Sequence, residues 1–521
     1  MKIPSRLLAV LSVFAAAAAI LLTGCGGGGG GGGTTADPAT LAPSDAPLFV
    51  EATLRPDGEL KSNIESLVKN VAGISDPGTL IIDRLNSSLA DANTGEKLTY
   101  EDDIEPWLGE KAGIYFSHYD GENFSGVAGV IQTTDSGAAK DFVDKAKESS
   151  DKESSYEGVD YVTSSGGTTI GVIDDFLVIA ADEQTFKGAV DTSNGDSLDG
   201  NDNYSSAVSN VPDNSLGDVY VDIGGLIRQA GPAVNQQVLQ FYSSLGYDIE
   251  NSTALASLVP GSDRVEVDVN SDLGGPSIGS GDVSDLLGSF PSDSLAAFAT
   301  PDVGTRIKQV IDQLDKTGVP PDVPPGALKS TLARQGIDID KIASSLGDIG
   351  VFAEGSDLAS LGGAAVMTTS DQQVAQDAIK SIGTLLKRSN ASGYTPVQGN
   401  ATGFAFRNPG LGRKPLLVLA SGDKIAIGYG VDAAQKALSA PSGNDLSSNE
   451  TFQRAQDSLG DTNMTGFVDA GAVLRLLEGL GVSSQIEQVR PYLDKLDFLS
   501  LGFGTEGDVS VTKFIAALKQ G

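Results

Sequence analysis

The chain has 521 residues, of which 69 are acidic and 35 basic, so its formal net charge at pH 7 is −34. A chain this acidic is repelled by nucleic-acid phosphates and by anionic lipid head groups, which excludes nucleic acid as a partner. With 40% hydrophobic residues the chain is expected to fold, and its length predicts two or more domains.

The first 24 residues have the three parts of a secretory signal peptide. Lys2 and Arg6 form a positively charged start, residues 7–22 are uncharged and rich in alanine and leucine, and small residues follow. The apolar run is shorter than the roughly 20 residues that a membrane-spanning helix needs. We therefore predict a signal peptide over residues 1–24.

The signal ends in Leu22, Thr23, Gly24 and Cys25. This order of an aliphatic residue, a small residue, glycine and cysteine resembles the lipobox of bacterial lipoproteins. The resemblance implies that a diacylglycerol is attached to the thiol of Cys25 and that cleavage makes Cys25 the new N-terminus. Cys25 is the only cysteine, so its acylation leaves no thiol for a disulfide or a metal. The alternative is a plain signal peptide with an incidental cysteine.

Residues 26–33 are an unbroken run of glycine, which has maximal backbone freedom and no side chain to bury. We predict a lipidated, glycine-rich tether over residues 25–42. The expected location is the extracytoplasmic face of the cell membrane, and the expected partner is membrane lipid through the acylated Cys25.

After the tether, the hydrophobic periodicity alternates between that of strands and that of helices. Strands are predicted at residues 48–54, 112–118, 125–133, 168–173, 176–181, 219–221, 264–269, 498–503 and 509–515. Helices are predicted at residues 60–71, 138–147, 185–190 and 204–208, and from the strand at 219–221 to about residue 245. This mixture of hairpins and helices predicts an α+β fold, in which helices pack on a mainly antiparallel sheet.

Short patterns of the first half return in the second half in the same order. The matching segments are 43–49 with 291–298, 108–116 with 346–352, 133–135 with 368–370, and 221–228 with 468–475. A collinear series of matches indicates an internal repeat. We predict two homologous tandem units, residues 43–280 and 291–521, joined by a linker at 281–290.

Each unit has a leucine, then an aromatic residue that opens a short helix, then a strand that ends in aspartate. The residues are Leu198, Tyr204 and Asp222 in the first unit and Leu446, Phe452 and Asp469 in the second. In this pattern the body resembles an uncharacterised family of bacterial envelope proteins, a domain of unknown function. That family has no established activity, so the resemblance implies a fold and no chemistry.

Two motifs are similar to catalytic or nucleotide-binding signatures. His118 is the only histidine and would have to be the base of any serine triad, but no Gly-x-Ser-x-Gly turn accompanies it. Residues 502–507 spell the dinucleotide pattern Gly-x-Gly-x-x-Gly, but a strand follows instead of the helix that a phosphate site needs. We therefore expect His118 to lie at the mouth of a hairpin and residues 502–507 to form a glycine-rich hairpin turn.

An oxygen-rich loop could hold calcium; its members are Asp191, Asn194, Asp196, Asp199, Asn201, Asp202 and Asn203. Counted from Asp199, however, the positions where a calcium loop needs glycine and glutamate hold Tyr204 and Asn210. A solvated turn that caps the next helix is the preferred interpretation.

Polar residues shared by the two halves are expected to cap helices rather than to catalyse. These pairs are Asp222 with Asp469, Asp182 with Asp432, and Asp135 with Ser370. Arg228 and Arg475 each follow their aspartate by six residues, and we expect each to form a salt bridge with another element.

These observations predict a membrane-anchored lipoprotein with a non-catalytic binding or structural role in the cell envelope. Cys25 is the only site residue predicted, with no catalytic residue, metal or cofactor. Three alternatives remain: a solute-binding lipoprotein of an importer, a lipid carrier and, less favoured, an envelope hydrolase that uses paired carboxylates.

Overall fold

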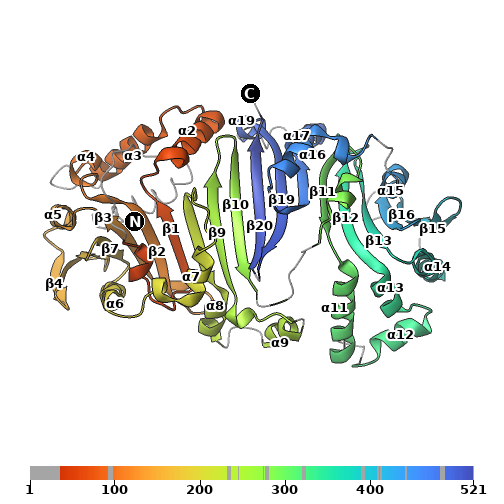
Figure 1. The fold of residues 1–521 in the computed structure, drawn as a ribbon, viewed down its shortest axis with the longest axis horizontal. Coiled ribbons are helices and arrows are strands. Elements are labelled where there is room, and N and C mark those ends of the chain that lie inside the picture. Colours follow the sequence, from red (N-terminus) through yellow and green to blue (C-terminus); the bar gives the residue numbers. More distant parts are fainter. Residues whose placement is uncertain are drawn as a thin grey trace. The chain divides into compact units, whose positions relative to one another are not determined.

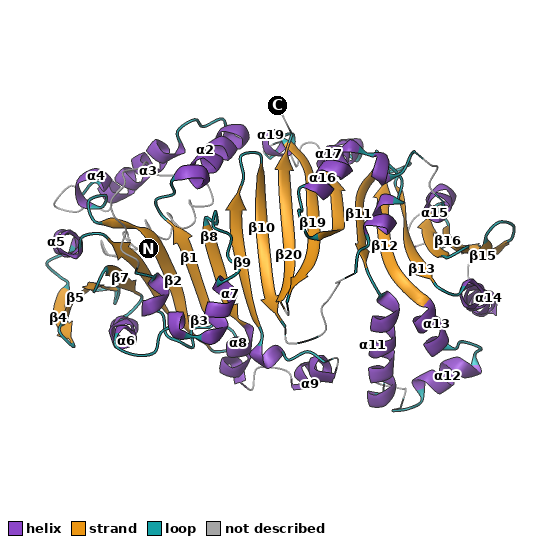
Figure 2. Ribbon diagram, in the orientation of Figure 1, coloured by secondary structure: helices purple, strands orange, loops and turns teal. Residues whose placement is uncertain are grey.

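The structure is a computed structural model of the chain. It describes residues 36–91, 98–231, 236–244, 246–273, 275, 281–318, 324–388, 393–407, 410, 413–439, 443–481, 487, 489–507 and 509–519. The chain divides into two compact units, residues 1–243 with 247–275 and residues 244–246 with 276–521, called unit 1 and unit 2 below. Each unit contains an antiparallel sheet and helices, so the α+β prediction is confirmed (Figures 1 and 2).

The sheet of unit 1 has the strand order β4-β5-β6-β7-β3-β2-β1-β8-β9-β10, and every neighbouring pair is antiparallel. Its strands are β1 (Leu48–Thr53), β2 (Leu108–Tyr119), β3 (Phe124–Thr133), β4 (Lys152–Tyr156), β5 (Val159–Thr163), β6 (Thr169–Ile173), β7 (Phe176–Ala180), β8 (Gly217–Asp222), β9 (Thr253–Pro260) and β10 (Arg264–Asp272).

The helices described with unit 1 are α2 (Gly58–Ala72), α3 (Pro77–Asp91), α4 (Tyr100–Asp103), α5 (Ser136–Ala146), α6 (Glu183–Ser193), α7 (Asp202–Val208), α8 (Ile223–Ala230) and α9 (Gln236–Ser244). Short 3-10 turns are η1 (Pro38–Leu41), η2 (Leu198–Gly200) and η4 (Ile249–Asn251).

Unit 2 has the strand order β14-β15-β16-β17-β13-β12-β11-β18-β19-β20, again antiparallel throughout. Its strands are β11 (Ser294–Thr300), β12 (Leu346–Glu354), β13 (Gly362–Thr369), β14 (Thr395–Val397), β15 (Thr402–Phe406), β16 (Leu416–Ser421), β17 (Lys424–Tyr429), β18 (Asn463–Asp469), β19 (Leu496–Glu506) and β20 (Val509–Leu518). Strand for strand, this is the order found in unit 1.

The helices of unit 2 are α10 (Ser284–Gly288), α11 (Val303–Thr317), α12 (Leu328–Arg334), α13 (Ile339–Ser345), α14 (Gln372–Arg388), α15 (Val431–Leu438), α16 (Glu450–Asp457), α17 (Ala470–Gly479) and α19 (Arg490–Leu493), with the 3-10 turn η6 (Leu446–Ser448). Within the described ranges of both units, no helix has the length and apolar character needed to span a bilayer.

Local sequence explains why helices and strands alternate. In α5 the apolar residues Ala139, Phe142, Val143 and Ala146 recur at helical spacing and are all buried. The hairpin of β6 and β7 is an apolar run, and both of its strands are buried along their whole length. Its side chains alternate between two hydrophobic clusters on opposite faces of the sheet, as strand geometry requires.

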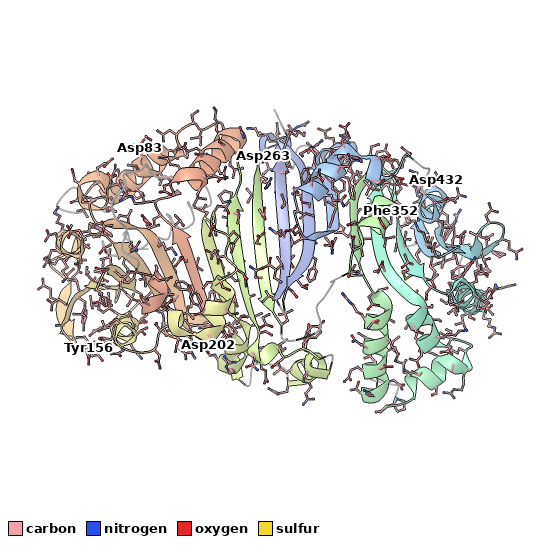
Figure 3. The ribbon with its side chains drawn as sticks, in the orientation of Figure 1. Asp83, Tyr156, Asp202, Asp263, Phe352 and Asp432 are labelled. Carbon is pink, nitrogen blue, oxygen red and sulfur yellow. The ribbon has the colours of Figure 1, made fainter. Side chains whose placement is uncertain are left out.

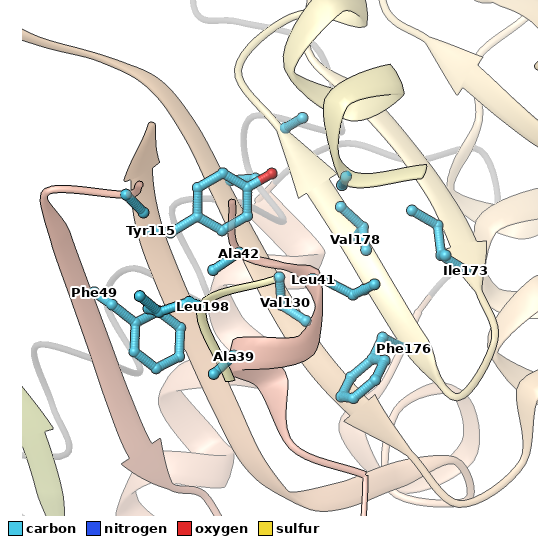
Figure 4. Packing of buried hydrophobic residues seen from close by; sticks show 14 of the residues in the cluster. Ala39, Leu41, Ala42, Phe49, Tyr115, Val130, Ile173, Phe176, Val178 and Leu198 are labelled. Atoms are coloured by element: carbon cyan, nitrogen blue, oxygen red, sulfur yellow. The ribbon is translucent and has the colours of Figure 1, made fainter. Parts of the chain in front are cut away.

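The core of unit 1 reaches into the segment predicted as a tether. Asp37 accepts a hydrogen bond of 2.8 Å from the amide of Ala39 and starts η1, and Ala39, Leu41 and Ala42 are buried beside Phe49 and other core residues (Figure 4). The tether prediction of residues 25–42 is therefore too long, because apolar side chains at 39–42 gain more from burial than from solvation.

The linker predicted at residues 281–290 is also part of a core. Val283, Leu287 and Phe290 are buried in unit 2, where the ring of Phe290 lies 5.2 Å from that of Phe352. Within this segment, Ser284–Gly288 form the helix α10. The apolar residues of the predicted linker therefore pack in the hydrophobic core of unit 2.

Some elements differ from the predicted ones. The long helix expected to reach about residue 245 is two helices, α8 and α9. In unit 1 the sequence analysis missed α3, α4, β4, β5 and β9, and in unit 2 it predicted ranges only for β19 and β20. In β4, the pattern Lys-Glu-Ser-Ser-Tyr is polar throughout and carries no apolar alternation, because this strand lies at the sheet edge.

Candidate functional site

The predicted lipidation residue, Cys25, lies outside the described residues, as do the signal peptide and the glycine run. The lipid anchor therefore stays a prediction from sequence. The first residues with described structure, from Ala36 onward, belong to the folded body of unit 1.

The leucine–aromatic motif forms the same structure in both units. Leu198 and Leu446 are fully buried, and each backbone amide donates to a carbonyl at the start of its unit, Ala42 at 2.8 Å and Phe290 at 2.7 Å. Tyr204, which follows Leu198, packs edge-on against Phe49 and Tyr220. The motif thus joins the start of each unit to its core.

An asparagine inside this motif was missed by the sequence analysis as a shared residue. Asn201 accepts hydrogen bonds from two amides at the start of α7, and its Nδ2 donates to the Ser44 carbonyl at 2.9 Å. Asn449 does the same for α16 and donates to the Ser292 carbonyl at 3.0 Å. We call this arrangement the asparagine clasp; asparagine suits it because one side chain must both accept and donate.

Most of the predicted caps are confirmed. Asp135, Asp182, Asp222 and Asp469 each accept a hydrogen bond from an amide in the first turn of the following helix. These carboxylates are therefore committed to helix amides, as the sequence predicted.

Two of the predicted caps are wrong. Asp432 lies inside the first turn of α15, and the cap position is held by Gly430, which has no side chain to bond (Figure 3). Ser370 donates to the carbonyl of Ser345, and it is Asp371 that accepts from the Val374 amide of α14. Matching by sequence offset misses these shifts because a helix can start one or two residues earlier or later.

The two shared arginines behave differently. Arg228 forms an ion pair with Asp222 at 3.2 Å and donates to the Glu250 carbonyl of η4 at 2.6 Å. Asp222, the carboxylate partner, is the N-cap of the helix α8 that carries Arg228. The contact of Arg228 with η4 is a hydrogen bond to a carbonyl and not a salt bridge. Among the described residues, Arg475 has no ion-pair or hydrogen-bond partner.

His118 and the glycines of residues 502–507 lie in hairpins, as expected from the sequence. His118 is exposed near the end of β2, opposite Ser125 of β3. Gly502 and Gly504 lie within β19, and Gly507 has φ +61° in the turn that leads to β20. No helix follows these glycines, so the hairpin prediction is confirmed.

The oxygen-rich loop is divided among several local hydrogen bonds. Asp191 accepts from the Tyr156 hydroxyl at 3.0 Å, and Asn201 belongs to the clasp. In the described part of the chain, no group of three or more histidine, cysteine, aspartate or glutamate side chains is arranged to hold a metal ion. The turn interpretation accounts for the contacts that are present.

A polar cleft in unit 2 is the best-formed candidate site. It consists of two adjoining hollows of about 370 and 520 Å³, which share Asp293, Gly355 and Ser360. The smaller hollow is lined by Ser292, Asp293, Ser294, Leu295, Gly355, Ser356, Ser360, Asn449, Asp469, Ala472 and Arg475. Both volumes lie in the range of small-molecule sites, roughly 300–1,000 Å³.

The larger hollow is built around a buried ion pair. Glu354 at the end of β12 is only 6% exposed, and its Oε2 lies 2.6 Å from Nζ of Lys436 in α15. Lys436 also lies 3.5 Å from Asp293. Lys414, in the same wall, donates to the Leu361 carbonyl at 2.7 Å. Carboxylates and ammonium groups therefore both line this hollow.

The second candidate is an apolar surface on the sheet of unit 2. Cross-strand neighbours place one row of side chains on a single face: Ile427, Ala365, Val351, Phe298, Gly466, Leu501 and Phe514. Phe298, Val351, Ile427 and Phe514 are 38 to 47% exposed. We call this set the apolar row.

A groove runs along the middle of the apolar row. It has a volume of about 350 Å³ and is lined by Phe298, Ala299, Thr300, Pro301, Ile349, Gly350, Val351, Thr465, Leu501 and Phe503. Among the described residues, no charged side chain lines this groove. The ring of Phe298 lies over Gly466, where an added Cβ would come within 2.7 Å of it.

Unit 1 contains a buried charged group that the sequence analysis did not single out. Glu51 in β1 pairs with Nζ of Lys111 at 2.6 Å, lies opposite Asp218 of β8, and leaves its Oε2 buried without a hydrogen-bond partner. Burial raises the pKa of Glu51 to about 7, with the Asp37 carboxylate adding to the effect. The only sequence signal was an acid in an apolar strand.

Comparisons with known proteins give a family and weak structural likenesses. No curated protein matches the chain. Three solved structures, crystal forms III, IV and I of TP0453, are 11% identical and have TM-scores of 0.25, 0.26 and 0.23. They cover 46 to 47% of this chain and 81 to 82% of their own, and likenesses this low carry no argument about fold or function.

The family match is much more extensive than these likenesses. The family described as "Protein of unknown function (DUF3352)" matches residues 6–501, which include most of both units. By this match, the chain belongs to the DUF3352 family.

Proposed function

We propose that this protein is a lipid-anchored, extracytoplasmic binding protein of the cell envelope, without catalytic activity. Cys25 would carry the acyl chains, and the glycine run would hold the body away from the bilayer. Because η1 already belongs to unit 1, the tether is limited to residues 25–35, with a typical reach of roughly 15–20 Å by random-coil scaling.

The observation that carries the binding role is the apolar row of unit 2. Contiguous apolar side chains on the surface of a soluble domain mark sites that bind another molecule. At three matching positions unit 1 has smaller side chains, Val50, Ala256 and Val269, where unit 2 has Phe298, Leu501 and Phe514. At two others unit 1 has the larger side chain, Ile114 against Val351 and Val219 against Gly466. Larger apolar groups at exposed positions favour a binding surface over a solvated one.

We also propose that the two units arose by tandem duplication. The equal strand order, the two asparagine clasps and the two aspartate caps, each followed six residues later by an arginine, support this origin. A duplicated fold lets one copy keep a structural role while the other acquires a ligand surface.

The groove favours one specific version of the binding role, that of a lipid carrier. Its lining includes the side chains of Phe298, Leu501 and Phe503 and no charged group, so a hydrocarbon chain fits it better than a polar solute. The polar cleft instead favours a solute-binding role, which belongs to the importer alternative.

The anchor is tested by detergent phase partitioning of the wild type and of Cys25→Ser. We expect the wild type in the detergent phase and Cys25→Ser in the aqueous phase or uncleaved, because two acyl chains suffice for stable membrane attachment. Equal partitioning of both into the aqueous phase contradicts the anchor.

The apolar surface is tested with cis-parinaric acid, whose fluorescence rises when its chain enters an apolar site. We expect Phe298→Gln and Leu501→Gln to weaken binding of the probe. The control is Val219→Thr, the exposed member of the matching row in unit 1. If the control weakens binding as much as Phe298→Gln, the groove is not the binding site.

A further inference from the structure

We propose that the polar cleft of unit 2 binds a small organic anion, and that Arg475 holds its carboxylate or phosphate group. The proposal concerns a different surface from the apolar row, so it stands or falls independently of acyl-chain binding. It starts from a comparison of Arg475 with its counterpart Arg228.

Both guanidinium groups fold back over the first turn of their helix, where a glycine leaves room. An added Cβ on Gly471 would lie 3.5 Å from Nη1 of Arg475, and one on Gly224 would lie 2.9 Å from Nη1 of Arg228. The two arginines therefore occupy equivalent places at the starts of α17 and α8.

Only one of these equivalent guanidinium groups is satisfied by the protein. Arg228 binds the Asp222 carboxylate and the Glu250 carbonyl, which leaves little for a ligand. In unit 2, Asp469 caps α17 through the Ala472 amide, but among the described residues it forms no ion pair with Arg475. A guanidinium has five donors and no acceptor, and oxyanions are its natural bidentate partners.

The open arginine faces a formed cleft, which Arg228 does not have among the hollows described. Serine hydroxyls and the amide of Asn449 line the wall around Arg475. One wall is the loop from Gly355 to Ser360, which packs so closely on α17 that a Cβ on Gly479 would lie 2.4 Å from the Ser356 carbonyl oxygen. The loop and the helix thus hold the wall in place.

The remaining charges of the cleft restrict the ligand. Asp293 and Asp469 also line the hollow around Arg475, so a polyanion would be repelled. The adjoining hollow adds Lys414, Asp432 and the Glu354–Lys436 pair, whose mixed charges suit hydroxyl or amide groups. The favoured ligand has a single carboxylate or phosphate group on a hydroxylated body.

The test is calorimetric titration of the full chain in nonionic detergent with gluconate in one arm and glucose 6-phosphate in the other. These probes distinguish a carboxylate from a phosphate on similar hydroxylated bodies. We expect at least one to bind the wild type, and Arg475→Gln to weaken that binding by roughly ten- to a hundredfold, the value of a charge-assisted hydrogen bond.

Arg228→Gln is the matched control. It removes the equivalent arginine of unit 1, and we expect it to leave anion affinity unchanged. A melting temperature of Arg475→Gln equal to that of the wild type would show that the lost binding is not a loss of folding. Absence of binding to both probes, or equal affinity in the wild type and in Arg475→Gln, overturns the proposal.

Discussion

Unit 1 and unit 2 share a strand order and an asparagine clasp, but they leave different groups open to solvent. In unit 1 the shared arginine is bonded within the protein, and the sheet row carries valine and alanine where unit 2 has phenylalanine and leucine. In unit 2 the equivalent arginine faces a cleft, and phenylalanine side chains stand on the sheet surface.

This difference separates architecture from function. Contacts that appear in both units, such as the caps and clasps, are explained by folding alone. Features found in one unit only are the better candidates for ligand binding, since the common fold does without them. The predictions below test this division, beginning with the largest expected effect.

The aromatic packing around the asparagine clasp should contribute more to the stability of unit 1 than to that of unit 2. Tyr204 contacts two rings, Phe49 and Tyr220, whereas Phe452 contacts Phe467 and has Ala297 at the place of Phe49. We expect Tyr204→Ala to cost about 3–5 kcal/mol and Phe452→Ala to cost less by about 1 kcal/mol, the value of one aromatic pair. Denaturant unfolding with hydrogen exchange resolved by unit measures both, and equal losses would contradict the comparison.

The buried carboxyl of unit 1 should make that unit sensitive to pH, since unit 2 has Ala299 at the place of Glu51. The pKa of Glu51 is about 7 in the folded state and 4.5 as its ordinary value, so between these values the folded state binds more protons than the unfolded state. The stability that protonated Glu51 contributes is therefore fully present below pH 4.5. As pH rises toward 7, the free energy of unfolding falls by about 3 kcal/mol.

Glu51→Gln should remove this loss, so that the variant gains stability relative to the wild type as pH rises. The measurement is urea unfolding of unit 1 across this pH range. Glu59→Gln, on the exposed surface of α2, is the control and should follow the wild type. A parallel pH profile for Glu51→Gln and the wild type would show that burial does not perturb this group.

The two asparagine clasps should contribute equally. We expect Asn201→Ala and Asn449→Ala each to lower the stability of their own unit by about 1–2 kcal/mol, the value of a helix cap. The Asp variants keep the cap but lose the bond to the Ser44 or Ser292 carbonyl, so a smaller loss is expected. Unequal losses would mean that the clasp is not a shared architectural contact.

The arginines should give the smallest effects on stability and the clearest contrast. Arg228→Gln removes an ion pair whose arginine is exposed and whose carboxylate, on Asp222, is buried, and it should cost up to about 1 kcal/mol. Arg475→Gln breaks no hydrogen bond or ion pair among the described residues and should leave the melting temperature unchanged. A destabilised Arg475→Gln would indicate a structural role like that of Arg228.

Local patterns in the chain were enough for the fold class, for most strands of unit 1 and for four of the six expected caps. Caps are local: an aspartate next to a helix finds its amides within four residues. The dinucleotide pattern was likewise rejected correctly, because the residues after Gly507 alternate as a strand. The wrong predictions at Asp432 and Ser370 are errors of two residues and one residue in helix starts, which depend on packing.

The candidate sites could not be predicted from these patterns because their members are far apart in the chain. Arg475, Ser292 and Ser360 line one hollow, and Phe298, Val351 and Phe503 line another. Strand register decides which of these side chains share a face, and a shift by one residue would reverse it. No spacing rule within the sequence contains that information.

The alternation of helices and strands and the caps at helix starts are properties of neighbouring residues, so the order of amino acids alone is enough to predict them. Whether an arginine is bonded or open, and whether a phenylalanine is buried or exposed, depends on which strands and loops come to lie beside it. Phe49 and Phe298 show this, since both lie in the first strand of their unit and only Phe49 faces the core.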